Sequence, residues 1–160
     1  SMCLYKTGTL ARFATKLGAI LGQGSKEQIE ALGKFAAIVG VAFQIQDDIL
    51  NITGTGQWGK KIGDDIHEGK HTLIVIHSLN NSSEEDSKRL LEILTLHSDK
   101  EEHVNEAVAL FEKHDSINYA RKRAKELVTE AWSEAEKVLS DSDAKEKLKA
   151  FATFLIERDI

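Results

Sequence analysis

Residues 43–72 concentrate the side chains that bind phosphates through metal ions. They include two adjacent carboxylate pairs, Asp47–Asp48 and Asp64–Asp65, and three lysines, Lys60, Lys61 and Lys70. Hard cations such as Mg²⁺ prefer carboxylate oxygens and usually keep phosphate oxygens and water molecules as their other ligands. Lysine ammonium groups then neutralise phosphate charge that the metal ions do not reach. The segment therefore predicts a site that holds a polyvalent anion through divalent cations.

The first carboxylate pair lies on a predicted helix, in which residues three and four apart share a face. Asp47 and Asp48 therefore project toward the same side as Gln44 and Asn51. Two carboxylates on one turn of a buried helix are costly unless a positive group neutralises them, and a bound cation does so. The same residues also fit a solvated helix end with exposed aspartates, so the spacing leaves both interpretations open.

The second carboxylate pair and the lysines also have structural interpretations. Asp64 and Asp65 follow Gly63 and a loop, so they can cap a short helix as readily as they can bind a metal ion. The lysines can be solvated side chains, although their position around two acidic pairs favours phosphate binding. His67 and His71 are four residues apart, but they do not form a HExxH motif, and we expect both at the surface.

A third group that can bind phosphate is Lys6-Thr7-Gly8, within a predicted helix. A helical glycine costs about 1 kcal/mol relative to alanine, and it often lets another backbone or a ligand approach closely. Lys6 and Thr7 would then offer a charge and a hydroxyl group to a phosphate. An exposed lysine beside a packing glycine explains the same residues.

Helices are expected to position these groups. The 160 residues include no proline, where average usage would give about eight. The chain thus lacks the commonest helix breaker, and its apolar periodicity predicts an all-α fold in one domain over residues 1–160. The expected helices are Leu4 to Leu21, Ser25 to Ile52, Thr72 to Leu79, Glu84 to Leu96, Glu101 to Lys113, Ser116 to Leu139 and Ala144 to Glu157.

Apolar spacing also predicts which helices are buried. The first helix has the pattern of a buried helix, and the middle of the second is apolar nearly all round, which places it deep in a bundle. Ser25 and Gln28 form a capping box, and Asp143 is expected to cap the last helix. Thr72 to Leu79 would suit a strand, but a lone strand would have no partner in this chain. Thr53 to Gly63 is expected to be a loop.

Composition and charge exclude several classes of protein. A net charge of -5 argues against a general nucleic-acid binder. No apolar run approaches the ~20 residues of a membrane span, and no signal peptide is visible. The single Cys3 cannot form an internal disulfide, so we expect a reducing compartment, the cytoplasm. The chain opens inside a helical pattern, so we expect it to be part of a longer protein.

The motifs together resemble the trans-isoprenyl diphosphate synthases, the polyprenyl synthetase family. FQIQDDILN followed by GKKIGDDIHEGKHTL is similar to the second aspartate-rich region of that family. KTGTL is similar to its Lys-Thr motif, HDSINYARKRAKELVTEA to a late helix and FLIERDI to its C-terminal end. The resemblance covers most of the chain. It implies the all-α isoprenoid synthase helical bundle, of which this chain would be the C-terminal half.

The resemblance implies a prenyltransferase that condenses isopentenyl diphosphate with an allylic diphosphate head to tail (1'-4), through an allylic carbocation. Mg²⁺ ions held by aspartate-rich motifs would bind the allylic diphosphate. The residues implied are Asp47, Asp48 and Asp65 for the metal, Lys6, Lys61 and Lys70 for the allylic diphosphate, Thr7 and Gln44 near the reacting carbons, and Phe43 for the apolar channel of the growing chain. The expected catalytic residues are Lys6, Thr7, Gln44, Asp47 and Asp48. Of these, Asp47 is the best candidate for direct contact with the metal.

Two departures from the family pattern bear on these expectations. The motif usually reads DDxxD, but Asn51 occupies its third position. An amide brings hydrogen bonding without charge, so we expect one metal site to be weaker. The family's first aspartate-rich motif has no counterpart in this chain, and family members are much longer. We therefore expect a fragment that is inactive by itself.

Several alternatives stay open. The stretches KTGTL and GVAFQIQDDIL favour geranylgeranyl diphosphate or a longer product over farnesyl diphosphate. A homodimer is expected because it is common in the family. The alternative function is a non-catalytic regulatory subunit of a heteromeric prenyl synthase, which Asn51 favours and the retained site residues disfavour. A terpene cyclase of the same fold would carry an NSE-type motif, which is absent from the sequence.

Overall fold

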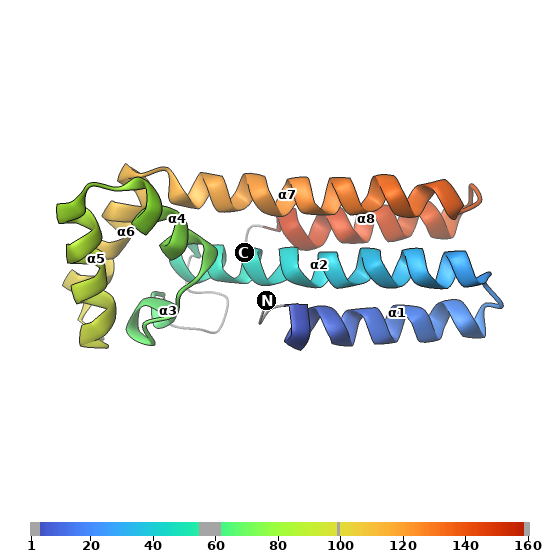
Figure 1. Cartoon of the computed structure of the whole chain (residues 1–160), viewed down its shortest axis with the longest axis horizontal. Helices are drawn as coiled ribbons and strands as arrows, with labels where there is room; N and C mark the ends of the chain where they lie inside the picture. Colours follow the sequence, from blue (N-terminus) through green and yellow to red (C-terminus); the bar gives the residue numbers. More distant parts are fainter. Residues whose placement is uncertain (1–3, 55–61, 99, 159–160) are drawn as a thin grey trace. The chain divides into compact units, whose positions relative to one another are not determined.

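The computed structural model describes residues 4–54, 62–98 and 100–158. Every regular element in these ranges is helical, which confirms the prediction of an all-α fold (Figure 1). In chain order the elements are a π-helical turn η1 (Leu4–Gly8), α1 (Thr9–Leu21), α2 (Lys26–Thr53), α3 (Asp64–His67), α4 (Leu73–Asn81), α5 (Glu84–Leu96), α6 (Glu101–Lys113), α7 (Ser116–Ala135), a 3₁₀ turn η2 (Glu136–Val138) and α8 (Asp143–Glu157).

The helices form two compact units. Unit 1 contains the residues up to Gln46 together with Arg123–Arg158, and unit 2 contains Asp47–Lys122. The long helices α2 and α7 each contribute residues to both units. The predicted acidic pairs therefore both belong to unit 2, whereas the Lys-Thr motif belongs to unit 1.

The sequence around Ser25 starts α2 by reciprocal hydrogen bonds. The Gln28 main-chain N–H donates to Ser25 Oγ at 3.2 Å, and the Ser25 N–H donates to Gln28 Oε1 at 2.9 Å. This is the predicted capping box, which satisfies N–H groups that the first turn leaves without intrahelical partners. Further along, Phe35, Ala42 and Ile49 are at most 2% exposed. The middle of α2 is therefore buried, as its apolar sequence predicts.

In unit 1, α2 lies beside α7 and α8 (Figure 1). The rings of Phe35 and Trp132 meet edge to face with their centroids 5.3 Å apart. Gln28 Nε2 donates to the Val138 carbonyl at 3.1 Å. A salt bridge of 3.1 Å between Lys125 and Glu157 joins α7 to α8. These contacts hold α2 beside α7 and η2, and α7 beside α8.

The prediction that the first helix is buried is wrong. No residue of α1 is buried, and its large apolar side chains are exposed, among them Leu10 (69%), Phe13 (65%) and Ile20 (55%). The helix meets α2 through another face, where Gly33 lies so close to the stem of Lys16 that a side chain at Gly33 would collide with it. Periodicity identifies an apolar face, but it does not say whether another element covers that face.

In unit 2, α5 and α6 pack as a pair. Leu90 and Ile93 of α5 and Phe111 of α6 are apolar and at most 1% exposed. At the margin of this contact the Arg89 guanidinium donates to both carboxylate oxygens of Glu106, at 2.6 and 2.7 Å. The two helices begin and end at the predicted residues because their apolar spacing and polar ends agree.

The N-caps of α4 and α8 can be compared with the predicted starts of these helices. Thr72 is the N-cap of α4, and its hydroxyl accepts a main-chain N–H of the first turn, so the segment Thr72 to Leu79 is helical as predicted. The last helix is capped by Ser142, whose Oγ accepts the Lys145 N–H at 3.2 Å. Asp143 is the first helical residue and not the cap, so that expectation is wrong by one position. Its carboxylate still stabilises the positive end of the helix dipole.

Among the described residues, α2 has the length and apolar composition that would allow a helix to cross a membrane. Its most apolar window is 44% buried within the fold. The core helix of a protein without a membrane span meets the same criteria, so the finding is weak support for a span. The expected absence of a transmembrane segment stays a prediction.

Candidate functional site

The first carboxylate pair lies near the end of α2, on the part of the helix that belongs to unit 2. Asp47 and Asp48 are half-buried, and Asn51, one turn later, is only 3% exposed. Asn51 lies four residues after Asp47 and three after Asp48, so the three side chains share a helix face. A fully solvated helix end, the alternative interpretation, does not describe these side chains.

Gly63 sets the direction of the second carboxylate pair. Its φ of 82° lies in the left-handed region, and a Cβ there would collide with the Val104 side chain of α6. Glycine is the residue that adopts this conformation without strain. Gly63 is also the N-cap of α3, so Asp64 and Asp65 are first-turn residues. The interpretation of these two aspartates as helix caps is therefore wrong.

Asn51 links the two acidic segments. Its Oδ1 accepts the Asp65 main-chain N–H at 3.1 Å, and its own main-chain carbonyl accepts the Gly63 N–H at 2.8 Å. The turn that carries Asp65 is thus bonded to the same helical turn of α2 that follows Asp47 and Asp48.

Lys70 lies against the carboxylate of Asp65. Its Nζ is 2.6 Å from Asp65 Oδ1 and 2.6 Å from Glu68 Oε2, and its main-chain N–H donates to the Asp65 carbonyl at 2.9 Å. The hydrogen bond to Asp65, followed by the one to Glu68, raises the pKa of Lys70 above the ordinary lysine value. Lys70 therefore stays cationic, as a group that binds phosphate must.

In unit 1, the Lys-Thr motif forms the π-helical turn η1 and packs against α2. Lys6 is exposed, Thr7 is half-buried and Gly8 is buried. A Cβ on Gly40 of α2 would lie 2.9 Å from the Gly8 Cα, so the two backbones are in close contact. This confirms that Gly8 permits a close approach. Gln44 is one helical turn after Gly40, so it shares the face on which the Lys-Thr turn lies.

Phe43 and Gln44 are both half-buried on α2. The Arg158 guanidinium lies over the Phe43 ring, with its central carbon 4.5 Å from the ring centroid. Gln46 Nε2 donates to the Arg158 carbonyl at 2.9 Å. The last described residue of the chain is thus held against the turn of α2 that carries two predicted site residues.

The oxygen donors of Asp47, Asp48 and Asp65 fit a hard divalent cation. Among the residues that the structure describes, no group of three or more His, Cys, Asp or Glu side chains is arranged closely enough to enclose a metal ion. Mg²⁺ is usually bound through one or two carboxylates together with substrate phosphates, and does not require a cage made by the protein alone. Carboxylate oxygens are thus the right kind of donor for such a cation, whose coordination a bound phosphate would complete.

Four further residues considered in the sequence lie between the two acidic segments or just after them. Lys60 and Lys61 lie outside the described residues. His67 and His71 are exposed, as expected. The His67 carbonyl is bonded to His97 Nδ1 of α5 at 3.0 Å, which fixes the end of α3.

Sequence reasoning did not assign roles to Glu68, His97 or Arg158. His97 and Arg158 contact residues that are distant in the chain, so local spacing gives no signal for them. The position of Glu68 between Asp65 and Lys70 could have indicated its salt bridge to Lys70.

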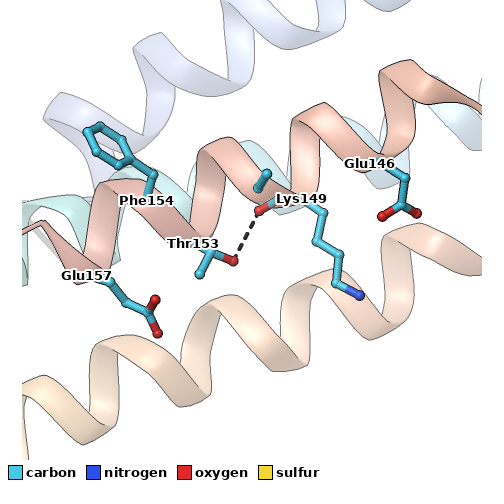
Figure 2. A pocket seen from close by; sticks show the side chains of 6 residues that line it. Glu146, Lys149, Thr153, Phe154 and Glu157 are labelled. Carbon is cyan, nitrogen blue, oxygen red and sulfur yellow. Dashed lines mark hydrogen bonds between the residues drawn. The ribbon is translucent and has the colours of Figure 1, made fainter.

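Side chains of α8 line a hollow in unit 1 (Figure 2). It is lined by Glu146, Lys149, Ala150, Thr153, Phe154 and Glu157. Thr153 Oγ1 donates to the Lys149 carbonyl at 3.1 Å, and Lys149 Nζ lies 5.8 Å from the centroid of the Trp132 ring. This hollow contains none of the predicted site residues, and we assign no function to it.

Comparison with known proteins identifies the family. The polyprenyl synthetase family model matches residues 1–111. The chain is 42% identical to a short chain isoprenyl diphosphate synthase of Methanothermobacter thermautotrophicus, over 99% of this chain and 48% of that protein.

Solved structures of similar fold agree. A polyprenyl synthase from Caulobacter crescentus, complexed with calcium and isoprenyl diphosphate, matches with a TM-score of 0.90 and 25% identity over 99% of this chain and 48% of that one. A geranylgeranyl pyrophosphate synthase from Corynebacterium glutamicum, complexed with isoprenyl diphosphate and magnesium, matches with a TM-score of 0.80 and 26% identity over 89% of this chain and 41% of that one.

The chain spans about half the length of the curated relatives it matches. The family match nevertheless extends over most of the sequence and includes the two acidic segments and the Lys-Thr turn. The chain belongs to the polyprenyl synthetase family, that of the trans-isoprenyl diphosphate synthases.

Proposed function

We propose that this chain forms part of a trans-prenyltransferase that joins isopentenyl diphosphate to an allylic diphosphate by 1'-4 condensation. The product would be geranylgeranyl diphosphate or a similar polyprenyl diphosphate. In this reaction the chain would hold the allylic diphosphate and its metal ions while the carbon–oxygen bond breaks. Fixed positive charge at the departing diphosphate lowers the barrier because negative charge accumulates there in the transition state.

The observation that carries the proposal is the link between the two acidic segments. Asn51 bonds to the turn that carries Asp65, and Asp65 in turn contacts Lys70 at 2.6 Å. The carboxylates that would bind the metal and the lysine that stays cationic belong to one compact unit. A protein that binds a metal–diphosphate complex needs both.

Each predicted residue then has a defined task. Asp47, Asp48 and Asp65 would hold a divalent cation, which when bound neutralises charge on the diphosphate. Mg²⁺ is the cation proposed, and magnesium is present with isoprenyl diphosphate in the Corynebacterium protein. Lys6, Lys61 and Lys70 would contact the diphosphate oxygens directly.

Three residues of α2 and η1 would act near the reacting carbons. Thr7 and Gln44 carry dipoles that can stabilise an allylic cation, and both are half-buried. The half-buried Phe43 ring would line the channel for the growing apolar chain. Apolar and aromatic walls also keep water from a cation, so Phe43 would serve that purpose as well.

A chimeric enzyme tests the proposal. The matching segment of the Methanothermobacter synthase is replaced by this chain, and turnover of isopentenyl diphosphate with an allylic diphosphate is measured. We expect activity in the chimera and a loss of at least about a hundredfold when Asp47→Ala is added, because a charged ligand contributes several kcal/mol to the transition state. A folded chimera without activity would contradict the proposal and support a regulatory subunit.

We further propose that the 160-residue chain does not turn over substrate by itself, because its sequence contains no DDxxD motif. We also propose that it forms homo-oligomers in the cytoplasm. The exposed apolar side chains of α1 support association, because contiguous apolar surface is usually covered by a partner. Appreciable turnover by the isolated chain would overturn the first of these statements.

A further inference from the structure

Asn51 is not among the proposed metal ligands, so its role needs another explanation. In this chain a neutral amide stands at the third position of the acidic motif, and its side chain is almost completely buried. Its oxygen accepts a main-chain N–H, that of Asp65, at 3.1 Å. An N–H group requires an oxygen as its partner, so this contact also fixes the orientation of the amide.

Asn51 holds the Asp65 turn at two points. The main-chain carbonyl of Asn51 accepts the Gly63 N–H at 2.8 Å, while its side chain accepts the Asp65 N–H. The backbone from Gly63 to Asp65 has little freedom, because Gly63 is in the left-handed region and lies against Val104. Asp65 therefore leaves the turn in a defined direction.

The other end of this segment is held as well. His97 Nδ1 is bonded to the His67 carbonyl at 3.0 Å, and a Cβ on Gly69 would lie 3.0 Å from the Leu94 carbonyl oxygen. The side chain of Ile66 is 3% exposed. With both ends fixed and the centre buried, the bond from Asn51 ties the Asp65 turn to α2.

We propose that Asn51 is a positioning residue that holds the turn of Asp65 against the end of α2, and that it is not itself a metal ligand. This inference rests on the function proposed above. A neutral acceptor performs the task without adding a third negative charge to that face of α2. Bonds that orient a ligating carboxylate typically change metal affinity by about tenfold or more when they are lost.

Hydrogen exchange tests the link without reference to activity. In the 160-residue chain we expect Asn51→Leu to accelerate exchange of the Asp65 amide by about tenfold, because it removes the acceptor. Asn51→Asp keeps an acceptor oxygen, so protection should be retained. Asn105→Leu, at an exposed position of α6, is the control and should leave Asp65 unchanged. If Asn51→Leu folds and exchange of its Asp65 amide is unchanged, the proposal is overturned. If Asn51→Leu does not fold, rapid exchange of the Asp65 amide in folded Asn51→Asp overturns it.

Calorimetry with Mg²⁺ and inorganic diphosphate tests the consequence. We expect Asn51→Leu to bind the pair about tenfold more weakly than the unaltered chain. Faster exchange with unchanged affinity would show a structural bond only and overturn the positioning role. If the unaltered chain does not bind Mg²⁺ and diphosphate at all, the proposed function fails, whereas the exchange result still decides whether Asn51 holds the turn.

Discussion

At the scale of single residues, Asp64 and Asp65 form a matched pair in the first turn of α3, but only Asp65 contacts Lys70. Asp65→Asn is expected to weaken Mg²⁺-dependent binding of inorganic diphosphate by about tenfold, since contacts of charged groups contribute roughly 1.5–3 kcal/mol. Asp64→Asn, which removes the same charge one residue away, should change the affinity by less than about threefold. Titration calorimetry compares the two. Equal losses would show that net charge alone governs binding.

Lys70 gives a prediction about pH. Its pKa is raised by Asp65 and Glu68, so the stabilisation from these pairs is present below the ordinary lysine value of 10.5 and is lost only as the pH rises through the higher folded-state pKa. The side chain is half-exposed, so the difference in unfolding free energy between the unaltered chain and Lys70→Met should stay below about 1 kcal/mol.

Thermal unfolding of both proteins at several pH values measures that difference. It should remain constant from neutral pH up to 10.5 and shrink only above it. A difference that disappears near neutral pH would mean that the Lys70 ammonium is not held by its two carboxylates.

At the scale of the elements, α2 depends on its capping box. Ser25→Ala removes the hydroxyl that accepts the Gln28 N–H, and it should lower the free energy of unfolding by about 1 kcal/mol. Ser133→Ala, at an exposed position within α7, is the control and should change it by less than about 0.5 kcal/mol. Urea denaturation followed by circular dichroism checks both, and equal effects would contradict the role of Ser25 as a cap.

The elements also show how far the sequence predicts this molecule. Periodicity and capping residues place α5 and α6 correctly and identify the start of α2, because these signals are local. They fail for α1, whose burial depends on surfaces that its own residues do not specify. They also miss the N-cap of α3, because the left-handed conformation of Gly63 and its position against Val104 leave no local signal in the sequence.

The predicted site shows the same limit. The residue types around Asp47 and Asp65 indicate a metal–phosphate site, and the resemblance to a family supplies roles for them. The hydrogen bond from Asp65 to Asn51 is not visible in the sequence, because it joins a turn to a helix residue 14 positions away. Contacts of this kind depend on which distant segments pack together, and spacing along the chain does not record that.

At the scale of the whole molecule, the apolar side chains of α1 predict self-association. Leu10, Phe13 and Leu17 are three and four residues apart, so they lie on one face, and each is at least 45% exposed. We expect the chain to elute as an oligomer, and Phe13→Glu to shift it toward the monomer, because a charge in an apolar interface is costly.

Size-exclusion chromatography with light scattering measures both masses. Lys34→Glu, at an exposed position of α2, is the control and should leave the mass of the chain unchanged. A monomeric unaltered chain at the same concentration would contradict association through α1.

The most direct test of the proposed function is binding of an allylic diphosphate, geranyl diphosphate, to the 160-residue chain by calorimetry with and without Mg²⁺. We predict that binding requires Mg²⁺ and that Asp47→Asn weakens it by about tenfold or more, because the aspartate would hold the ion that bridges to the phosphate. Binding of equal strength without Mg²⁺, or in the Asp47→Asn variant, would contradict a metal–diphosphate site on the acidic turn of α2.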